Sequence, residues 1–252
     1  GVFTAETSSL TVQMIANGSC FGLGVLGAGA HQFANSTAGA INAAATATTI
    51  QILSGEENEA VGVFGVGARH FATQTVHGRV GVATTNTTVR VTALNGNAGV
   101  GLHGLAAHHH SRIATGNVTA TANDTAINIT ASGFYNNGVG VLGIGTDDHA
   151  NATVADVRLR AWQSTFHTFA ATISNHGVGL GGLGVSFANA SATAEFVSAQ
   201  VVDVVAVVSA NNFNVGVGVL GLAAREESVR ATASSVIATA VGGSVSVSTG
   251  TA

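Results

Sequence analysis

The sequence predicts an all-β solenoid, a β-solenoid of about six and a half repeats of 39 residues. Two observations carry this prediction. Five asparagines, at positions 58, 97, 136, 175 and 214, recur at a constant interval of 39 residues, and each precedes a run in which glycine alternates with apolar residues. A 3.6-residue apolar period is absent from any window of about 12 residues, whereas alternation with period two is common. A fixed period of this length indicates a stack of equivalent units rather than a globular domain around one site.

The repeats divide the chain into one domain, 1–252. A sixth glycine run carries Cys20 where the others have asparagine. With the glycine of each Val-Leu-Gly-like triplet as a marker, the units are a partial repeat 1–26, the repeats 27–64, 65–103, 104–142, 143–181 and 182–220, and a partial repeat 221–252.

Segment A, the first strand-like part of each repeat, is the glycine run itself, for example 138–145. Glycines recur on one side of it, at Gly62, Gly101, Gly140, Gly179 and Gly218. A strand face without side chains lets another backbone layer approach closely. We expect that layer to be the opposite wall of the interior, with a neighbouring filament as the alternative. These strings are not phosphate loops, because no helical pattern follows them.

Segments B and C follow polar corners and alternate with period two. In segment B, Val157 and Leu159 point one way and Arg158 and Arg160 the other. Segment C carries pairs of apolar residues two positions apart: Ile50/Ile52, Val89/Val91, Ile127/Ile129, Val205/Val207 and Val245/Val247, with Phe166/Thr168 as the weak copy. Alternation with β-branched residues predicts half-buried strands.

The asparagine column predicts one roughly three-sided coil per repeat. Strands in adjacent coils lie about 4.8 Å apart, a spacing at which identical asparagine side chains form a hydrogen-bonded ladder. Two coils per repeat would place the asparagines about 9.6 Å apart, beyond hydrogen-bond reach. We therefore expect Asn58, Asn97, Asn136, Asn175 and Asn214 to lie inside the coil as a structural ladder.

Composition excludes several function classes. Charged residues make up 8% of the chain and the net charge is −4, which provides no electrostatic reason to expect nucleic acid as a partner. The long uncharged stretches are interrupted by Asn, His and Gly, so we expect no membrane-spanning helix. A single cysteine excludes an internal disulfide framework. The opening at Gly1, without a methionine, is compatible with a mature or excised segment.

The titratable residues do not predict an enzyme or a cofactor. The acidic residues are scattered, and no nucleophile–base arrangement stands out. The nearest approach to a metal site is a corner where His70 and Asp148 are expected to flank His109, and His149 to stack on His110. The same columns carry Gln32, Phe187 and Glu226, so the pattern is not maintained and we expect no metal there.

The two ends of the stack predict self-assembly. The chain contains no proline, and all its basic residues are arginine, so two common protections of a sheet edge are missing. Both termini remain strand-patterned. Open and mutually similar ends join head to tail, and a contact of this kind that does not close produces a filament. The expected partner is therefore a second copy of the chain, with lateral bundling as a further expectation.

The asparagine ladder, the Gly/Ala/Thr-rich repeats and the low charge resemble secreted bacterial β-solenoid fibre subunits of the functional-amyloid kind, such as curli. The repeat is about twice as long as a curli repeat and lacks that family's regular glutamine columns. The resemblance implies an extracellular or cell-surface location, and roles in adhesion, surface anchoring or biofilm matrix.

Two alternatives remain. The chain could be a stalk segment of a larger cell-surface adhesin, which shares the fold. It could also be an ice-binding solenoid, which needs a flat threonine array. The outward column of segment B is read as Asn42, Gly81, Thr119, Arg158, Val197 and Val236, in which threonine is not maintained.

Overall fold

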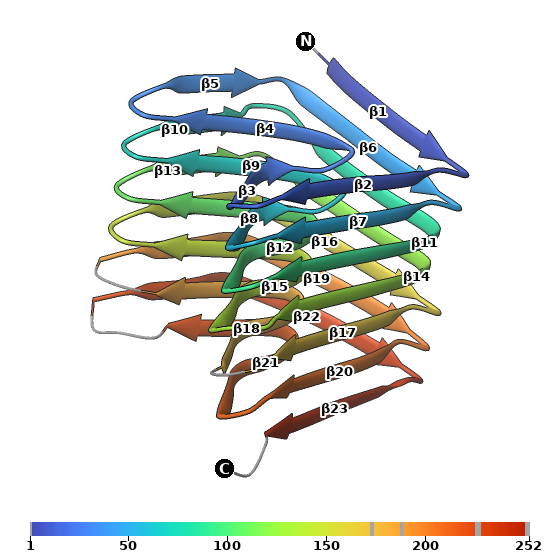
Figure 1. Ribbon diagram of the computed structural model, residues 1–252. Helices are drawn as coiled ribbons and strands as arrows, with labels where there is room; N and C mark the ends of the chain where they lie inside the picture. The colour runs from blue at the N-terminus through green and yellow to red at the C-terminus, as the bar shows by residue number, and fades with distance from the viewer. Residues whose placement is uncertain (1, 172–173, 187–188, 225–227, 250–252) are drawn as a thin grey trace.

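The computed structural model is a β-solenoid in which successive coils stack in parallel, and its strands form two parallel sheets (Figure 1). It describes residues 2–171, 174–186, 189–224 and 228–249, and these residues contain strands and turns but no helix. The N-terminal strands lie at one end of the stack and the C-terminal strands at the other (Figure 1). Phe187 and Glu226, used above to judge the histidine columns, lie outside the described residues.

Segments B and C belong to the larger, 15-stranded sheet. In the first coils they are separate strands: β1 (Val2–Ser8) and β6 (Ala40–Thr46) for B, and β2 (Thr11–Ala16) and β7 (Thr49–Ser54) for C. In the middle coils β11 (Val80–Ala93) and β14 (Val118–Ala131) run through both segments. In the last coils B lies in β16 (Asn151–Trp162), β19 (Ser191–Val202) and β22 (Arg230–Val241), and C is β17 (Thr165–Ala170), β20 (Val205–Ala210) and β23 (Ser244–Thr249).

Segment A forms the smaller, eight-stranded sheet. Its strands are β3 (Cys20–Leu23), β4 (Leu26–His31), β8 (Glu57–Val61), β9 (Phe64–Arg69), β12 (Gly96–His108), β15 (Tyr135–Asp147), β18 (Ser174–Ser186) and β21 (Phe213–Ala224). After the next corner a short strand precedes segment B. It is β5 (Asn35–Ala38), β10 (Thr73–Val76) or β13 (Arg112–Thr115) in the first coils, and the start of β16, β19 or β22 in the later ones.

One coil per repeat is confirmed by the strand register. In the smaller sheet Asn97 of β12 pairs with Asn136 of β15, and Asn136 pairs with Asn175 of β18. Each coil therefore lies directly on the coil one repeat earlier. A stack with two coils per repeat would have paired each strand with a different segment.

Segment A is not a straight strand, which is the main difference from the predicted coil. The chain reverses within it, so that Gly138 lies against Ile144 and Gly143 against Gly138. A Cβ on Gly138 would overlap the Ile144 carbonyl oxygen, and Gly138 also has a φ of 61°, a conformation that favours glycine. We call residues 97–105 and their equivalents in the other coils the glycine arch. Glycine is needed because the two arms of the arch pack backbone against backbone.

The core runs the length of the stack between the arches and the larger sheet. Ile50, Ile52, Leu102, Ile127 and Leu142 are among its largest fully buried side chains. Each such side chain contributes about 1.5–3 kcal/mol when removed from water. The predicted alternation is confirmed in segment B, where buried Val157 and Leu159 alternate with exposed Arg158 and Arg160, and in segment C, where Ile50 and Ile52 are buried on either side of the less buried Gln51.

Two predicted columns are wrong after the fourth full coil. β16 pairs with β19 at an offset of 40, so Val157 lies on Val197, and the outward column continues instead through Ser198 and Ile237. In segment C the buried pair is Ala206 and Val208, not Val205 and Val207. The extra residue is compensated before β21, which returns to an offset of 39. A shift of one residue turns every side chain to the other face.

Candidate functional site

The predicted asparagine ladder is present inside the coil. Each side-chain amide donates from Nδ2 to Oδ1 of the asparagine in the next coil, at 3.0 Å from Asn58 to Asn97, 2.8 Å from Asn97 to Asn136, 2.8 Å from Asn136 to Asn175 and 2.7 Å from Asn175 to Asn214. The same Nδ2 atoms also donate to a segment C carbonyl, for example Thr92 O and Ser209 O. This second bond sets the direction of the ladder, because only the amide nitrogen can donate to a carbonyl. The first four asparagines are fully buried.

The ladder ends below Cys20. Cys20 pairs with Asn58 and is buried, but a thiol is a weak hydrogen-bond donor. Its Sγ lies 3.9 Å from Leu53 O, the carbonyl that an asparagine would have bound. Asn58 Oδ1 consequently has no hydrogen-bond partner among the described residues. Burial raises the pKa of the Cys20 thiol, which favours an inert group over a reactive thiolate.

The predicted glycine face lies at the tip of the arch. A Cβ on Gly62, Gly101, Gly140 or Gly179 would overlap the backbone of the next coil, whereas a Cβ on Gly218 would meet its nearest atom, Leu220 O, at 3.6 Å. The close approach is therefore inside the molecule, between successive coils and between the two arms of each arch. The lateral alternative is not needed to explain these glycines.

The C-terminal end exposes side chains that are buried in the preceding coils. Val236 continues a column that runs through Val157 and Val197, yet it is 43% exposed against 0% and 1% for these two. Val245 and Val247 of β23 are 60% and 50% exposed. No arch follows β23 within the described residues, so the inward faces of β22 and β23 remain uncovered.

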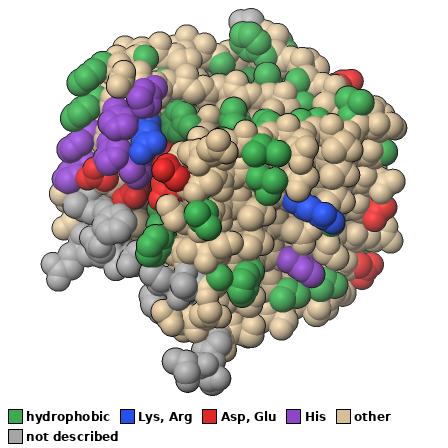
Figure 2. Space-filling model, in the orientation of Figure 1, with side chains coloured by type: hydrophobic (Ala, Val, Ile, Leu, Met, Phe, Trp, Pro, Cys, Tyr) green, Lys and Arg blue, Asp and Glu red, His purple; other side chains and the backbone are tan. Residues whose placement is uncertain are grey.

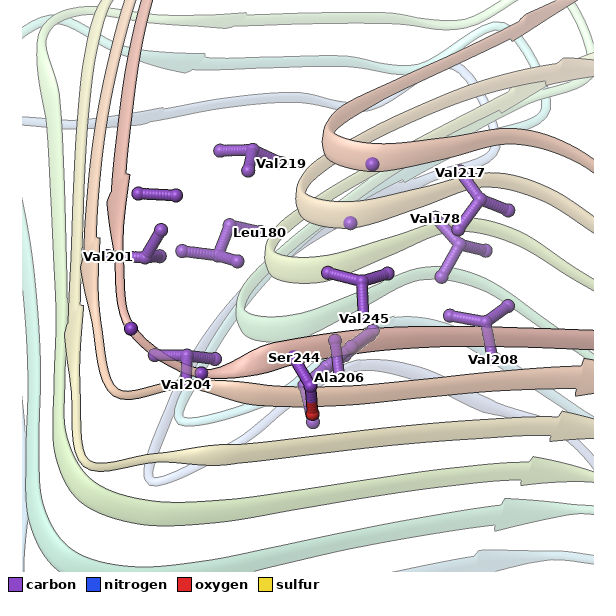
Figure 3. Close-up of a pocket in the computed structure, with 16 residues that line it drawn as sticks. Val178, Leu180, Val201, Val204, Ala206, Val208, Val217, Val219, Ser244 and Val245 are labelled. Carbon is purple, nitrogen blue, oxygen red and sulfur yellow. The ribbon is translucent and has the colours of Figure 1, made fainter.

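An apolar hollow of about 190 Å³ lies beneath this end. Leu180 and Val217 line it from the arches, and Val208 and Val245 line it from segment C (Figure 3). The hollow therefore lies between the arches of β18 and β21 and the last strands of the larger sheet. At the opposite end of the stack Phe3, Leu10 and Ile15, on and beside β1 and β2, are exposed.

The corner after segment A gathers most of the histidines on one outer edge of the stack (Figure 2). At the four corners that the structure describes in full, two successive residues adopt a positive φ, as in His109 and His110 (48° and 58°) and Asp148 and His149 (47° and 62°). His and Asp tolerate this region better than β-branched residues do. Backbone bonds such as His110 N to Asp148 O, at 2.9 Å, hold the corners one above another. Equal turns then project equivalent side chains in the same direction.

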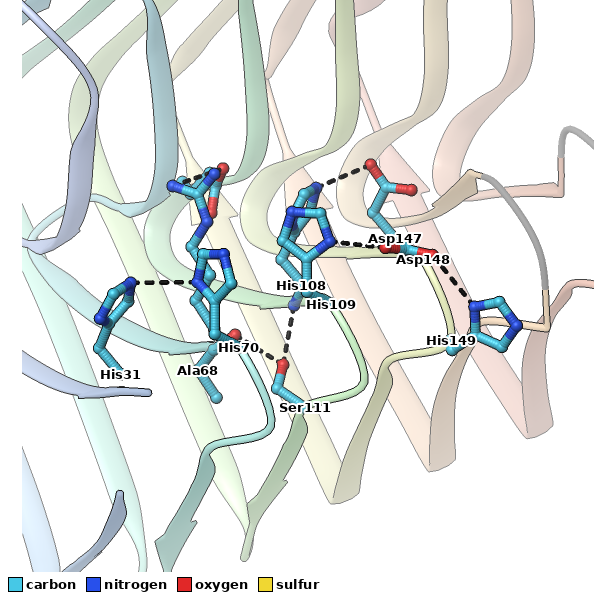
Figure 4. Close-up of polar contacts among 11 residues, drawn as sticks. His31, Ala68, His70, His108, His109, Ser111, Asp147, Asp148 and His149 are labelled. Carbon is cyan, nitrogen blue, oxygen red and sulfur yellow. Dashed lines mark hydrogen bonds and ion pairs between the residues drawn. The ribbon is translucent and has the colours of Figure 1, made fainter. Parts of the chain in front are cut away.

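The predicted contacts at this corner are confirmed. His109 lies between His70, at a ring separation of 4.8 Å, and Asp148, whose Oδ2 is 2.5 Å from His109 Nδ1 (Figure 4). The His149 ring stacks on His110 at 4.5 Å. His149 Nδ1 also lies 3.0 Å from Asp148 Oδ1. The hydrogen bonds from His109 and His149 hold the pKa of Asp148 below its usual value, so this side chain is a carboxylate at neutral pH.

A second pair of polar side chains, His108 and Asp147, meets beside the first and was not predicted from the sequence. His108 Nε2 lies 3.0 Å from Asp147 Oδ2 (Figure 4). Burial opposes a charge on His108, but the hydrogen bond to Asp147 and the nearby Glu59 carboxylate outweigh it and raise the His108 pKa. Arg69, in register with His108, reaches Glu59 at 4.0 Å. The signal was present in the sequence, because His108 and Asp147 are one repeat apart.

Comparisons with known proteins add no assignment: no protein-family model, curated protein or solved structure matches the chain. Among the described residues, no helix has the length and apolar character needed to cross a membrane.

Proposed function

We propose that this chain is the structural subunit of an extracellular filament that polymerises head to tail by β-strand augmentation. The observation that carries the proposal is the exposure of core columns on β22 and β23. Val236, Val245 and Val247 belong to columns that are buried in the preceding coils, and here they face solvent. Stacking another coil on them would bury part of this apolar surface against residues of the same columns.

The opposite end of a second copy supplies matching strands. If the coil register continues, β22 pairs with β1 and β23 pairs with β2, which sets Val236 on Phe3 and Val245 on Val12. These residues belong to the same two columns, because Phe3 pairs with Ile41 and Val12 with Ile50 in the first coils. The junction therefore repeats contacts that already occur between coils.

The backbone groups of the two edges are also complementary. Ser244 N donates to Val204 O at 3.0 Å, so this residue of β23 faces the preceding coil. Alternate residues of a parallel strand direct their N–H and C=O groups to opposite neighbours. Val245 and Val247 therefore present theirs to the open edge. In the continued register the Val247 N–H donates to the Gln13 carbonyl, and the Gln13 N–H donates to the Val245 carbonyl.

The proposed location and roles have separate support. Secretion, adhesion, surface anchoring and a place in a biofilm matrix come from the resemblance to functional-amyloid fibre subunits described above. The small net charge of −4 fits assembly without strong repulsion between subunits. A filament subunit needs no catalytic group, and the ladder and arches supply a mechanical framework.

Val247→Pro tests the strand pairing. Proline removes the outward N–H of β23 but no hydrogen bond inside the subunit, so the coil should fold while polymerisation is lost. Val247→Thr keeps the N–H and the β-branch, and it should polymerise like the parent chain. Circular dichroism checks the fold of both variants and electron microscopy scores filaments. Equal polymerisation of Val247→Pro and Val247→Thr would reject pairing through β23.

The subunit rise distinguishes two junctions. Seven B strands, β1 to β22, at about 4.8 Å each predict a rise of about 34 Å when β22 pairs with β1. A junction that instead joins the arch of β21 to β3 predicts about 29 Å, one strand spacing less, and requires β1 and β2 to move aside. Persistent monomers at micromolar concentration would contradict the filament proposal.

A second candidate is a stalk segment of a larger cell-surface adhesin, favoured by the hollow in Figure 3. One additional arch of the same chain would fill this hollow, whereas a strand-paired junction between copies leaves it open. A synthetic chain extended by one arch and one short strand tests this. If the extension abolishes polymerisation and raises stability, the stalk function is favoured over the filament.

A further inference from the structure

We propose that the outer corner of the third and fourth arches binds one divalent transition-metal ion through His110, Asp148 and His149. This site is independent of filament assembly, because its residues follow β12 and β15, which lie between β9 and β18 within the stack and not at its ends (Figure 1). The ligand atoms of the three residues lie within 4.8 Å of one another. The group stands out from the other described His, Cys, Asp and Glu residues, where no further set of three is so close.

Two of the three ligands already have a suitable spacing. Ligands 2.0–2.1 Å from a tetrahedral ion are about 3.3 Å apart. His149 Nδ1 and Asp148 Oδ1 are separated by 3.0 Å. An ion that replaces the proton between them therefore requires a small separation of the two atoms. The third ligand, His110, stacks on His149 with ring centroids 4.5 Å apart and an interplanar angle of 19°. A tilt of this ring closes the remaining distance.

The third ligand is free to make that tilt. His110 is exposed, and Asp148 and His149 are half-buried, so an ion and one or more water ligands reach the corner from solvent. On its other face His110 stacks on Phe71 at 4.9 Å, which holds the ring near the site, and its imidazole makes no hydrogen bond to another described side chain. The corner backbone is held between coils by hydrogen bonds and need not move.

A neighbouring histidine orients the carboxylate. His109 Nδ1 lies 2.5 Å from Asp148 Oδ2, the oxygen that the ion does not use. Hydrogen bonds of this kind set the orientation of a metal-ligating carboxylate and strengthen binding. His109 is in turn packed between His108 and His70, at ring separations of 4.0 Å and 4.8 Å. The supporting residue is therefore itself fixed by the stack.

The ligand chemistry selects the class of ion. Two imidazoles and one carboxylate suit Zn²⁺, Cu²⁺ and Ni²⁺, whereas Ca²⁺ and Mg²⁺ prefer sites built from oxygen alone. The sequence argued against a metal because the histidine column is not maintained along the stack. The structure removes this objection, because a single pair of adjacent coils supplies all three ligands.

The test is a titration of the full chain, produced without a histidine tag, with Zn²⁺ alone and with Cu²⁺ alone. Calorimetry should show one Zn²⁺ per chain, and the electron paramagnetic resonance spectrum of bound Cu²⁺ should show two nitrogen ligands. His110→Phe places in this corner the residue that the preceding coil carries and keeps the aromatic stack. It should weaken Zn²⁺ binding at least tenfold and reduce the nitrogen ligands to one.

Two further variants complete the test. Asp148→Asn should also weaken Zn²⁺ binding at least tenfold. His31→Gln is the control. It removes an exposed histidine of the same edge that contacts His70 and none of the three ligands, and it should bind Zn²⁺ like the parent chain. Ca²⁺ should produce no binding heat. The proposal is overturned if the parent chain binds no Zn²⁺ or Cu²⁺, if His110→Phe binds as tightly as the parent, or if His31→Gln loses the ion.

Discussion

A buried histidine in the third arch predicts acid sensitivity of the whole stack. His103 has no exposure to solvent and lies between Phe64 and Leu142 in the adjacent coils. Its ring stacks on Phe64 at 5.0 Å, and Nδ1 donates to Phe64 O at 3.2 Å, but Nε2 has no partner among the described residues. Burial lowers the pKa of His103 from 6.5 to about 4, although the hydrogen bond to Phe64 opposes the shift.

The sign and size of the effect follow from proton linkage. Below pH 6.5 the unfolded chain protonates this histidine, while the folded chain keeps it neutral down to about pH 4. The unfolded state therefore binds more protons over this interval, and the free energy of unfolding falls as the pH falls. At about 1.4 kcal/mol per pH unit, the total loss is about 3 kcal/mol, complete below pH 4. Above pH 7.5 both states keep His103 neutral, so His103 causes no loss of stability there.

His103→Leu removes this loss and installs the residue found at Leu142 in the next coil. The unpaired Nε2 also disappears, so the variant should be more stable than the parent by about 1–3 kcal/mol at pH 7.5. The stability difference between variant and parent should then grow by about 3 kcal/mol between pH 7.5 and pH 4. Other titrating groups are common to both chains and cancel in this difference.

The assay is urea unfolding of monomeric chain, followed by circular dichroism and by fluorescence of Trp162, at four pH values from 7.5 to 4. Midpoints are compared at constant slope, because a changed slope indicates loss of two-state behaviour in a repeat array. His167→Asn is the matched control: this side chain is exposed, and Asn128 occupies the registered position in the preceding coil. A stability difference between His103→Leu and the parent that is equal at pH 7.5 and pH 4 would refute the reasoning.

Three further changes test the ladder and the arches by the same unfolding assay. Cys20→Asn should stabilise the chain by about 1–2 kcal/mol, because the new amide can donate to the unpaired Asn58 Oδ1 and to a backbone carbonyl; an unchanged midpoint would show that the ladder does not extend. Asn136→Leu should destabilise by about 2–4 kcal/mol, since it leaves ladder atoms in both neighbouring coils unpaired. Gly140→Ala should lower the free energy of unfolding by about 1–3 kcal/mol, because the new Cβ overlaps the next coil. Gly218→Ala, whose new Cβ would meet its nearest atom, Leu220 O, at 3.6 Å, should change stability by less than about 0.5 kcal/mol. Equal effects of the two substitutions would contradict the close approach of the arches.

The asparagine ladder was predictable because it depends on one distance. Identical residues one repeat apart lie one strand spacing apart if each repeat is one coil, and only that spacing permits amide-to-amide bonds. Asn97, Asn136 and Asn175 confirm this with bonds of 2.8 Å. The same rule predicted that His149 stacks on His110, and it would have found His108 and Asp147 as well.

The predicted side-chain columns are wrong where one residue is added to the repeat and another is removed before the next asparagine. Asn175 and Asn214 are 39 residues apart, but the strands between them, β19 and β20, are displaced by one residue relative to the coil before. An asparagine-based register cannot detect an extra residue that is removed again before the next asparagine. Val197 was therefore assigned to the wrong face, although alternation itself was read correctly.

The sequence by itself determined the repeat, the all-β character, the single coil per repeat and the interior position of the asparagines, because all of these follow from periodicity along the chain. Tertiary structure alone decided the reversal within the glycine arch, since alternation of glycine and valine is equally compatible with a straight strand and with two arms packed on each other. It also decided which corner residues meet as a cluster and which core columns are left uncovered at the C-terminal end. These features depend on distances between coils and on what lies beyond the last strand, and neither is encoded in the local pattern.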